Sequence, residues 1–345
     1  MSSGSSGRSK RSGLRWRRVG GLVAGTVRLL GWPIVVALTL LSASRLGVWL
    51  MPPMVQAAQA VTPVVYLPVW AVAIGAVFTR RRWLGLAAAA LAVVHVAVVA
   101  PALGRAAQPD WTLSAPTFRL LVANVYKDNP RPVEVADLVR DVDADVVVLV
   151  EATPQLADAL DLRGVLDDYP YRAGGTRADP RGSLVLSRLP ITAPIELDVA
   201  GTPPVGVTIT VADRPVDLVA VHPLPPLTSG AGGEWFDQHG AFAGLARRDR
   251  YERVALALAG DFNATRWQPP FGQLLDAGLD DIHESVGRGL SRSWPARGGA
   301  ARSVLGPLAR LDHALVSPGL FPLEVTDLDV PGSDHRGFVT RLAVR

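Results

Sequence analysis

The stretch LALAGDFNAT, residues 256–265, is the clearest structural signal in this 345-residue chain. Its first five residues are small or apolar and predict a buried strand, and Asp261 and Asn263 follow where that strand ends. A buried carboxylate or amide is costly unless it is hydrogen-bonded. The stretch therefore predicts polar side chains that are held at the rim of a buried sheet.

Other apolar runs also border polar residues. Three runs end in one: FRLLVA (118–123) before Asn124, DVVVLV (145–150) before Glu151, and VDLVAV (216–221) before His222. Two later segments, LDH (311–313) and SDH (333–335), add Asp312, His313, Asp334 and His335. The set is rich in oxygen donors and the chain has no Cys, which favours a hard cation such as Mg²⁺ or Mn²⁺ over zinc.

The pattern from residue 117 onward is typical of an α/β fold. Short apolar runs predict strands at 118–123, 145–150, 183–187, 205–211, 215–221, 255–259, 311–316 and 337–344. Helical periodicity appears at about 132–142, 154–161, 234–250 and 268–277. Residues 204–222 predict a β-hairpin with Ala212, Asp213 and Arg214 at its turn. Many short strands with few helices favour an α/β sandwich over a helical bundle, and no GxGxxG or GxxxxGK loop for a nucleotide occurs.

Eight motifs follow one another in a distinctive order: ANV (123–125), VLVEATP (148–154), GSLVLSRLPI (182–191), VAVHP (219–223), GDFNAT (260–265), RSWP (292–295), RLDHALVS (310–317) and GSDHRG (332–337). In this order they resemble the endonuclease/exonuclease/phosphatase superfamily of DNase I-like phosphoesterases. The N-terminal third resembles a bacterial subgroup with transmembrane helices before this domain. The resemblance implies a four-layer α/β sandwich, in which two packed mixed sheets are flanked by helices, and a Mg²⁺ or Mn²⁺ cofactor.

The resemblance also implies a role for each matching residue. Glu151 would be the principal metal ligand, with Asn124 beside the metal and Asp334 at a second acidic metal position. Asp261 and Asn263 would orient the attacking water and contact the scissile phosphate. His335, polarised by Asp312, would act as a base or as a phosphate ligand, and His222 would hold or protonate the phosphate.

Several other polar residues fit simpler roles. His313 is expected to make structural hydrogen bonds, and Asp280 and Asp281 are expected in a solvated loop. His239 and His283 match no motif and are expected as surface or core residues. The sequence offers no evident carboxylate partner for His222.

The N-terminal third has the composition of a membrane module. Residues 1–110 carry 12 Arg and Lys against one acid, whereas residues 111–345 carry 23 against 30. Residues 83–104 contain no charged residue, and about 20 apolar residues cross a bilayer. Residues 57–79 and about 29–50 predict two further spans, the latter with Arg45 near its end. His95, alone in the third span, is expected to be a packed helix residue.

The basic clusters predict the topology. Residues 8–18 and Arg80–Arg82 lie on one side of a three-span module, which the positive-inside rule makes cytoplasmic. The predicted organisation is a basic disordered arm (1–28), a membrane module (29–104), a linker (105–116) and an extracytoplasmic catalytic domain (117–345). The alternatives are a cleaved signal peptide in place of the first span, and two spans with a cytoplasmic domain.

Together these features predict a multi-pass, membrane-anchored, divalent-metal-dependent phosphoesterase that is nuclease-like and cleaves phosphodiester or phosphomonoester bonds. Its partners would be the lipid bilayer and a nucleic acid, a nucleotide or a phospholipid headgroup; no protein partner can be inferred. The acidic balance of residues 111–345 disfavours sequence-independent DNA binding, and the local arginines are expected to be solvated (Arg247, Arg248, Arg250, Arg253, Arg297 and Arg302). The alternatives are a phospholipid-headgroup phosphodiesterase of the same fold and a non-catalytic, membrane-tethered binding module.

Overall fold

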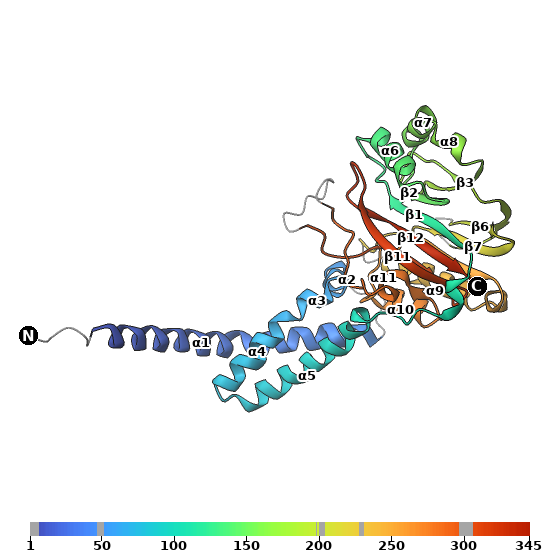
Figure 1. Ribbon diagram of the computed structural model, residues 1–345. Helices are drawn as coiled ribbons and strands as arrows, with labels where there is room; N and C mark the ends of the chain where they lie inside the picture. Colours follow the sequence, from blue (N-terminus) through green and yellow to red (C-terminus); the bar gives the residue numbers. More distant parts are fainter. Residues whose placement is uncertain (1–6, 47–51, 198, 200–203, 228–230, 297–305) are drawn as a thin grey trace, which may run out of the picture. The chain divides into compact units, whose positions relative to one another are not determined.

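The computed structural model describes residues 7–46, 52–197, 199, 204–227, 231–296 and 306–345, with side chains from residue 25 onward. Arg297 and Arg302 therefore lie outside the described residues. The chain forms two compact units, one within residues 1–48 and 61–100 and the other within residues 49–60 and 101–345 (Figure 1).

The smaller unit is helical. It contains α1 (Gly7–Ala43), η1 (Ser44–Leu46), α3 (Thr62–Val65), α4 (Leu67–Phe78) and α5 (Arg82–Val99). Helix α1 begins at Gly7, so most of the arm that was expected to lack structure is helical. No proline precedes Pro33, and Leu, Arg and Ala favour a helix there.

Two helical stretches of 22 residues, Gly25–Leu46 and Arg82–Leu103, are long and apolar enough to cross a membrane. The expected span at 57–79 is instead a bent pair of helices, Pro53–Ala60 and Thr62–Phe78. Proline at the start of α3 and of α4 explains the interruptions, because a proline ring fits the first turn of a helix and not its interior. The two helices of the bent pair make a third span only if they cross the membrane together as a single span.

Polar side chains join the helices of this unit. The hydroxyl groups of Ser42 and Tyr66 lie 2.6 Å apart, and Trp70 Nε1 donates to His95 Nδ1 at 3.0 Å. The rings of Tyr66 and His95 stack with centroids 5.5 Å apart. Polar contacts of this kind add about 1 kcal/mol to helix association in apolar surroundings. His95 is buried and is a packed helix residue, as the sequence predicted.

The larger unit is built on two six-stranded sheets. The first has the order β11-β12-β1-β2-β4-β3 and the second β5-β6-β7-β8-β10-β9. The strands of the first are β1 (Thr117–Asn124), β2 (Val146–Val150), β3 (Tyr171–Gly175), β4 (Ser183–Ser187), β11 (Leu320–Asp329) and β12 (Arg336–Val344). Those of the second are β5 (Ile191–Ile195), β6 (Val205–Val211), β7 (Arg214–Val221), β8 (Ala255–Asp261), β9 (Asp280–Asp281) and β10 (Asp312–Val316).

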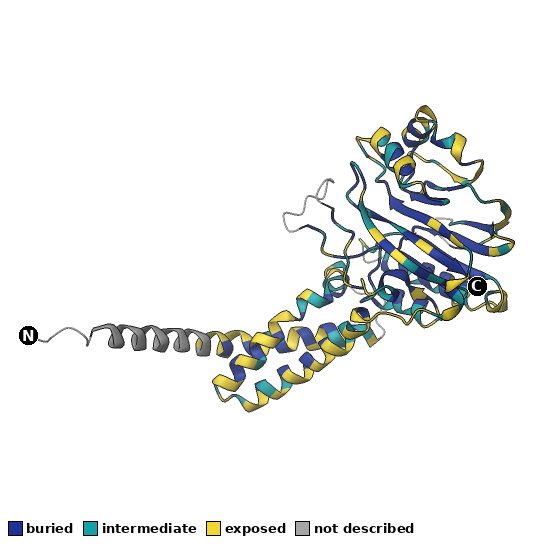
Figure 2. Ribbon diagram, viewed as in Figure 1, coloured by how far each residue is buried: buried dark blue, intermediate teal, exposed yellow. Residues whose placement is uncertain are grey.

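The helices of this unit complete a four-layer sandwich, as predicted. They are α2 (Pro53–Ala60), α6 (Pro132–Val142), α7 (Pro154–Leu162), α8 (Val165–Asp168), α9 (Ala231–Ala246), α10 (Pro269–Leu275) and α11 (Ile282–Ser285), with short 3₁₀ turns η2 (Ala100–Leu103), η3 (Asp110–Leu113) and η4 (Asp249–Glu252). Helices α6, α7 and α8 bury the outer face of the first sheet, and α9 and α10 bury that of the second (Figure 2).

Alternation along the strands assigns each side chain to a layer. In β2, Val146, Val148 and Val150 face the core between the sheets, whereas Val147 and Leu149 face the helices. In β8, Ala255, Ala257 and Ala259 face the inner core and Leu256 and Leu258 face the helices. Because successive side chains of a strand point to opposite faces, every second residue of these strands lies between the sheets.

Eight predicted strands are present, and the 204–222 hairpin is confirmed, with positive φ angles at Ala212 (45°) and Asp213 (67°) in its turn. The sequence missed β3, β5, β9 and the long edge strand β11. Strand β11 lacks an alternating apolar pattern and carries a register shift between Pro322 and Glu324, which explains why the sequence did not predict it.

Helix α9 ends at Ala246, so Arg250 lies beyond it. The Arg250 guanidinium donates through two nitrogens to the buried carboxylate of Asp217, at 2.7 and 2.9 Å.

We predict that Leu218→Ala, in the core between the sheets, destabilises the larger unit by about 2–5 kcal/mol, because the cavity cannot fully collapse. The melting temperature of the full chain in detergent, followed by tryptophan fluorescence, should fall by roughly 5–15 °C. Leu162→Ala, at an exposed position of α7, is the matched control and should change it by less than about 2 °C. An equal effect of the two substitutions would contradict the layer assignment.

Candidate active site

The candidate site forms at one rim of the sandwich because of how the strands run. Strands β1 and β2 are parallel, as are β7 and β8, so their carboxyl ends point the same way within each sheet. Strand β12 is antiparallel to β1 and β10 is antiparallel to β8. The first residues of β10 and β12 therefore lie beside the last residues of β8 and β1.

The same alternation that builds the inner core also selects the site residues. Asn124 continues the inward series Leu120 and Val122, and Asp261 continues the series Ala257 and Ala259. His222 and Asp312 occupy equivalent inward positions next to Ala220 and Ala314. The core between the sheets therefore ends in a layer of buried polar side chains.

Asn124 links the two sheets. Its Nδ2 donates to Glu151 Oε1 and to Asp261 Oδ2, both at 3.0 Å. Glu151 also accepts the backbone N–H of Lys127 through Oε2, at 2.8 Å. Glu151 has a φ of 57°, a left-handed conformation that is strained for a non-glycine residue.

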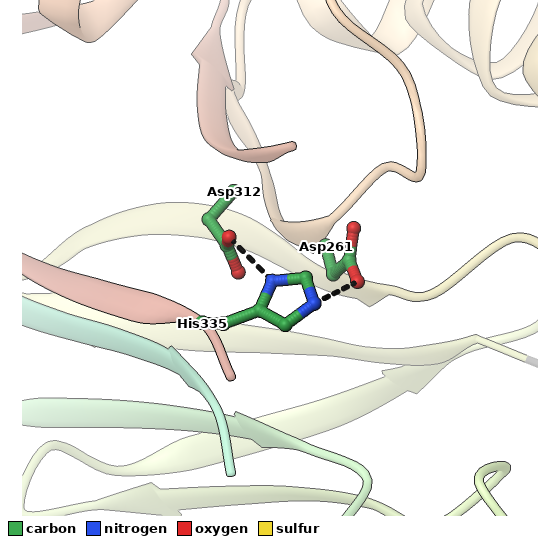
Figure 3. A group of neighbouring side chains, drawn as sticks. All are labelled: Asp261, Asp312 and His335. Atoms are coloured by element: carbon green, nitrogen blue, oxygen red, sulfur yellow. Dashed lines mark hydrogen bonds and ion pairs between the residues drawn. The ribbon is translucent and has the colours of Figure 1, made fainter. Parts of the chain in front are cut away.

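His335 and Asp312 form a buried hydrogen-bonded pair (Figure 3). His335 Nδ1 donates to Asp312 Oδ2 at 2.8 Å, which leaves Nε2 facing Asp261 Oδ2 at 3.7 Å. Burial by itself would lower the pKa of His335, but the carboxylates of Asp312 and Asp261 outweigh it and raise the pKa to about 10. The pair thus holds an imidazolium whose free N–H points into the site.

His222 is oriented by the backbone. Its Nδ1 lies 3.0 Å from the carbonyl oxygen of Pro180, so Nδ1 carries the proton, and Nε2 lies 3.7 Å from Glu151 and 3.8 Å from Asp261. A backbone carbonyl therefore takes the place of the carboxylate partner that the sequence lacked. No motif could have revealed Pro180 in this role, because any residue supplies a carbonyl group.

Gly260, near the end of β8, and Asn263, in the loop that follows, shape this part of the site. The Asn263 N–H donates to Asp261 Oδ1 at 2.7 Å, and Asn263 Nδ2 donates to the Pro223 carbonyl at 2.9 Å, which ties this loop to the one after β7. Gly260 has a φ of 147°, and a Cβ there would lie 2.1 Å from the Val221 carbonyl oxygen. Only glycine allows β7 and β8 to approach this closely at the rim.

Two serines that carried no predicted role hold the site loops. Ser333 donates to the Asn124 carbonyl at 2.8 Å and accepts the His335 N–H at 3.0 Å. Ser293 accepts the N–H groups of Leu311 at 3.0 Å and Asp312 at 3.2 Å. Both lie in the recognised motifs, but their bonds join segments that are distant in sequence.

Asp334 is placed differently from the other acids. It is partly exposed, and its Oδ2 accepts from Trp294 Nε1 at 3.3 Å. Among the described residues, no hydrogen bond or ion pair joins its side chain to Glu151, Asn124 or Asp261. The structure therefore gathers Asn124, Glu151, His222, Asp261, Asp312 and His335, with Asn263 beside them, and leaves Asp334 at the edge.

The prediction for Asp281 was wrong, whereas Asp280 is exposed as expected. Asp281 is buried and bonds His313 Nδ1 at 2.6 Å and the N–H of His283 at 2.8 Å. An Asp at the start of α11 accepts the free N–H groups of the first turn, which explains the burial. His239 and His283 are fully buried core residues.

The donor set fits a divalent cation. Ligand atoms of Asp261, Asp312 and His335 lie within 4.8 Å of one another, and the buried Asp312 Oδ1 has no hydrogen-bond partner among the described residues. The carboxylates of Glu151 and Asp261, which converge on Asn124, add further oxygen donors beside this group, and oxygen donors are the ligands that a hard cation prefers.

Two packed sheets with a rim of carboxylates, amides and histidines define the class of DNase I-like hydrolases, which act on phosphoester bonds. The chain belongs to the Endonuclease/Exonuclease/phosphatase family, whose sequence profile matches residues 121–335. Enzymes of this family generally depend on divalent metals. No curated protein matches the chain in sequence.

Solved structures share the fold at low sequence identity. TDP2 from D. rerio, complexed with single-strand DNA product, is 17% identical with a TM-score of 0.55, covering 66% of this chain and 99% of its own. An endonuclease/exonuclease/phosphatase from Beutenbergia cavernae is 18% identical with a TM-score of 0.50, covering 66% and 72%. A family protein from Bacteroides thetaiotaomicron is 16% identical with a TM-score of 0.51, covering 67% and 99%.

We predict that His335 stays an imidazolium at pH 8 in the metal-free protein, as measured by ¹⁵N NMR of its ring nitrogens. Its pKa of about 10 lies above the ordinary value near 6.5, so the pair stabilises the fold fully below about pH 6.5. That stabilisation should be lost as the pH rises through 10. Asp312→Asn should lower the pKa, and a neutral His335 ring at pH 7.5 in the unsubstituted protein would contradict the prediction.

Proposed function

We propose that the larger unit is a divalent-metal-dependent, nuclease-like phosphoesterase, and that the helices of the smaller unit anchor it in a membrane. The observation that carries this proposal is the convergence of Glu151, Asn124 and Asp261 on one side of the rim with the His335–Asp312 pair on the other. Together with His222, these residues supply a candidate for each group that phosphoester hydrolysis needs.

In this proposal, Glu151 and Asn124 would hold the metal, the partly exposed Asp334 would serve a second acidic position, and Asp261 would orient the attacking water. Mg²⁺ or Mn²⁺, when bound there, would neutralise charge on the phosphoryl oxygens and lower the pKa of a bound water. Asn263 fixes the Asp261 carboxylate through its N–H. The hydrogen bonds from Asn263 and Asn124 together set the plane of the Asp261 carboxylate, which faces the attacking water in this proposal.

The side chains then account for the proton transfers. Water attacks phosphorus opposite the leaving oxygen, and its proton passes to Asp261. The P–O bond to the leaving group breaks, and His222, which enters this step with a proton on each ring nitrogen and is held through Nδ1 by Pro180, delivers the Nε2 proton to the leaving oxygen. The proton taken up by Asp261 then returns to His222 Nε2, 3.8 Å away, before the next turnover. His335, held through Nδ1 by Asp312, turns Nε2 toward the site and donates Nε2–H to a phosphoryl oxygen, the phosphate-ligand role.

The proposed substrate is a phosphodiester, with nucleic acid first. The single-strand DNA product in the D. rerio TDP2 structure supports this choice by similarity of fold. A phospholipid headgroup is the second candidate, because two stretches of 22 residues are apolar enough to place the chain in a bilayer. The 30 acidic against 23 basic residues of 111–345 also favour it over duplex DNA.

We expect the full chain in detergent to hydrolyse bis-p-nitrophenyl phosphate, single-strand DNA or a phospholipid in the presence of Mg²⁺ or Mn²⁺. Asp261→Asn and His335→Gln should lower kcat by about 10²–10⁴-fold, and Glu151→Gln should raise the metal concentration for half-maximal activity. Glu324→Gln, an exposed ion-paired carboxylate on β11, is the matched control and should leave kcat unchanged. A folded protein that neither turns over these substrates nor binds metal would favour the non-catalytic binding module.

We also propose that the catalytic unit is extracytoplasmic. The chain has no Cys, so single cysteines introduced at Arg81 and at Asp158 can be labelled without background. A membrane-impermeant maleimide should label Asp158→Cys in intact cells, and should label Arg81→Cys only after the cells are permeabilised. The reverse pattern would place the catalytic unit in the cytoplasm.

A further inference from the structure

A second buried charged cluster lies on the helix-facing side of the second sheet. Its members are Asp281 at the start of α11, His313 on β10 and Arg310 just before β10, with 2%, 1% and 6% of their surfaces exposed. His313 Nδ1 lies 2.6 Å from Asp281 Oδ2, and Arg310 Nη2 lies 3.4 Å from the same carboxylate. The mechanism proposed above uses none of these three side chains.

Both ring nitrogens of His313 face acceptors. Nδ1 meets the Asp281 carboxylate, and Nε2 lies 3.2 Å from the Ala264 carbonyl and 3.0 Å from the Arg310 carbonyl. Because carboxylate and carbonyl oxygens cannot donate, each nitrogen must carry a proton to make these bonds. The ring is packed against Phe262 and Phe271, with centroids 5.7 and 4.5 Å away, so its orientation is fixed.

The two carbonyls belong to the two segments that carry the catalytic groups. Ala264 directly follows Asn263 in the loop after β8, and Arg310 lies two residues before Asp312. The same segments are joined by the Phe262 N–H, which donates to the Leu311 carbonyl at 2.9 Å. A single N–H of His313 therefore bridges the loop of Asp261 and Asn263 to the start of the strand that supplies Asp312.

We propose that His313, held by Asp281, is a positioning residue that sets the separation of Asp261 and Asn263 from the His335–Asp312 pair. His335 Nε2 and Asp261 Oδ2 are 3.7 Å apart, and this spacing depends on the relative placement of the two segments. A misplacement of about 1 Å at reacting groups can cost about 10²-fold in rate. The positioning role of His313 rests on the proposed hydrolysis, whereas the hydrogen bonds from its Nε2 to the Ala264 and Arg310 carbonyls do not depend on it.

Two substitutions separate the functions of the two ring nitrogens. His313→Gln places an amide donor near the position of Nε2 and keeps the bridge, whereas His313→Asn places it near Nδ1 and keeps only the bond to Asp281. Asp217→Asn is a control for lost stability, because Asp217 is another fully buried ion-paired carboxylate on the same sheet, five residues before His222. All variants are made in the full chain in detergent.

We expect all three variants to melt below the unsubstituted protein. Per folded molecule, His313→Gln and Asp217→Asn should keep kcat within about fivefold, whereas His313→Asn should lose about 10²-fold in kcat with KM changed less than about threefold. Amide hydrogen exchange at Phe262 and Leu311 should accelerate in His313→Asn and not in the other two variants.

Equal kcat losses in both His313 variants, with unchanged exchange at Phe262 and Leu311, would overturn the proposal and leave His313 as a core residue. If the unsubstituted protein hydrolyses none of the substrates, the proposed function fails. The exchange comparison then decides separately whether His313 bridges the two segments, because it needs no substrate.

Discussion

The site depends on the packing of two sheets face to face with their strand ends at a common rim. The apolar residues between the sheets fix this arrangement, since Val148, Leu218 and Ala257 are fully buried there and leave water when the sheets pack. Once the sheets are packed, the next inward position of each strand can only point into the same small volume. Asn124, His222, Asp261 and Asp312 are at those positions, so a hydrophobic constraint assembles a polar site.

Such an assembly is costly, because like charges are brought together away from water. The structure offsets the cost with hydrogen-bond donors: Asn124 between Glu151 and Asp261, and His335 beside Asp312. In the second cluster, His313 and Arg310 donate to the buried carboxylate of Asp281 and offset its charge in the same way. Two buried charge clusters thus lie on opposite faces of the second sheet, and β10 supplies Asp312 to one and His313 to the other.

The fold was largely predictable because its signals are local. Strand runs such as 145–150 and 255–259 are apolar and short, and the hairpin of 204–222 has its turn where the pattern breaks. Two of the misses share a cause: β11 is an edge strand with a register shift after Pro322, and Pro63 and Pro68 interrupt the second hydrophobic segment. In each case the run of apolar residues gives no information about the backbone irregularity.

The residue types, and the family resemblance that their order carries, were enough to predict most of the polar side chains that the structure gathers at the rim. The hydrogen-bond partners of these side chains could not be predicted from the sequence, because they are backbone groups or side chains that are distant in sequence. The Pro180 carbonyl orients His222, and Ser333 donates to the Asn124 carbonyl across 209 residues. Asp281, which was expected in a loop, is buried and hydrogen-bonded to His313. Hydrogen bonds are directional and short, so their pairing exists only after the apolar core has fixed where each strand ends.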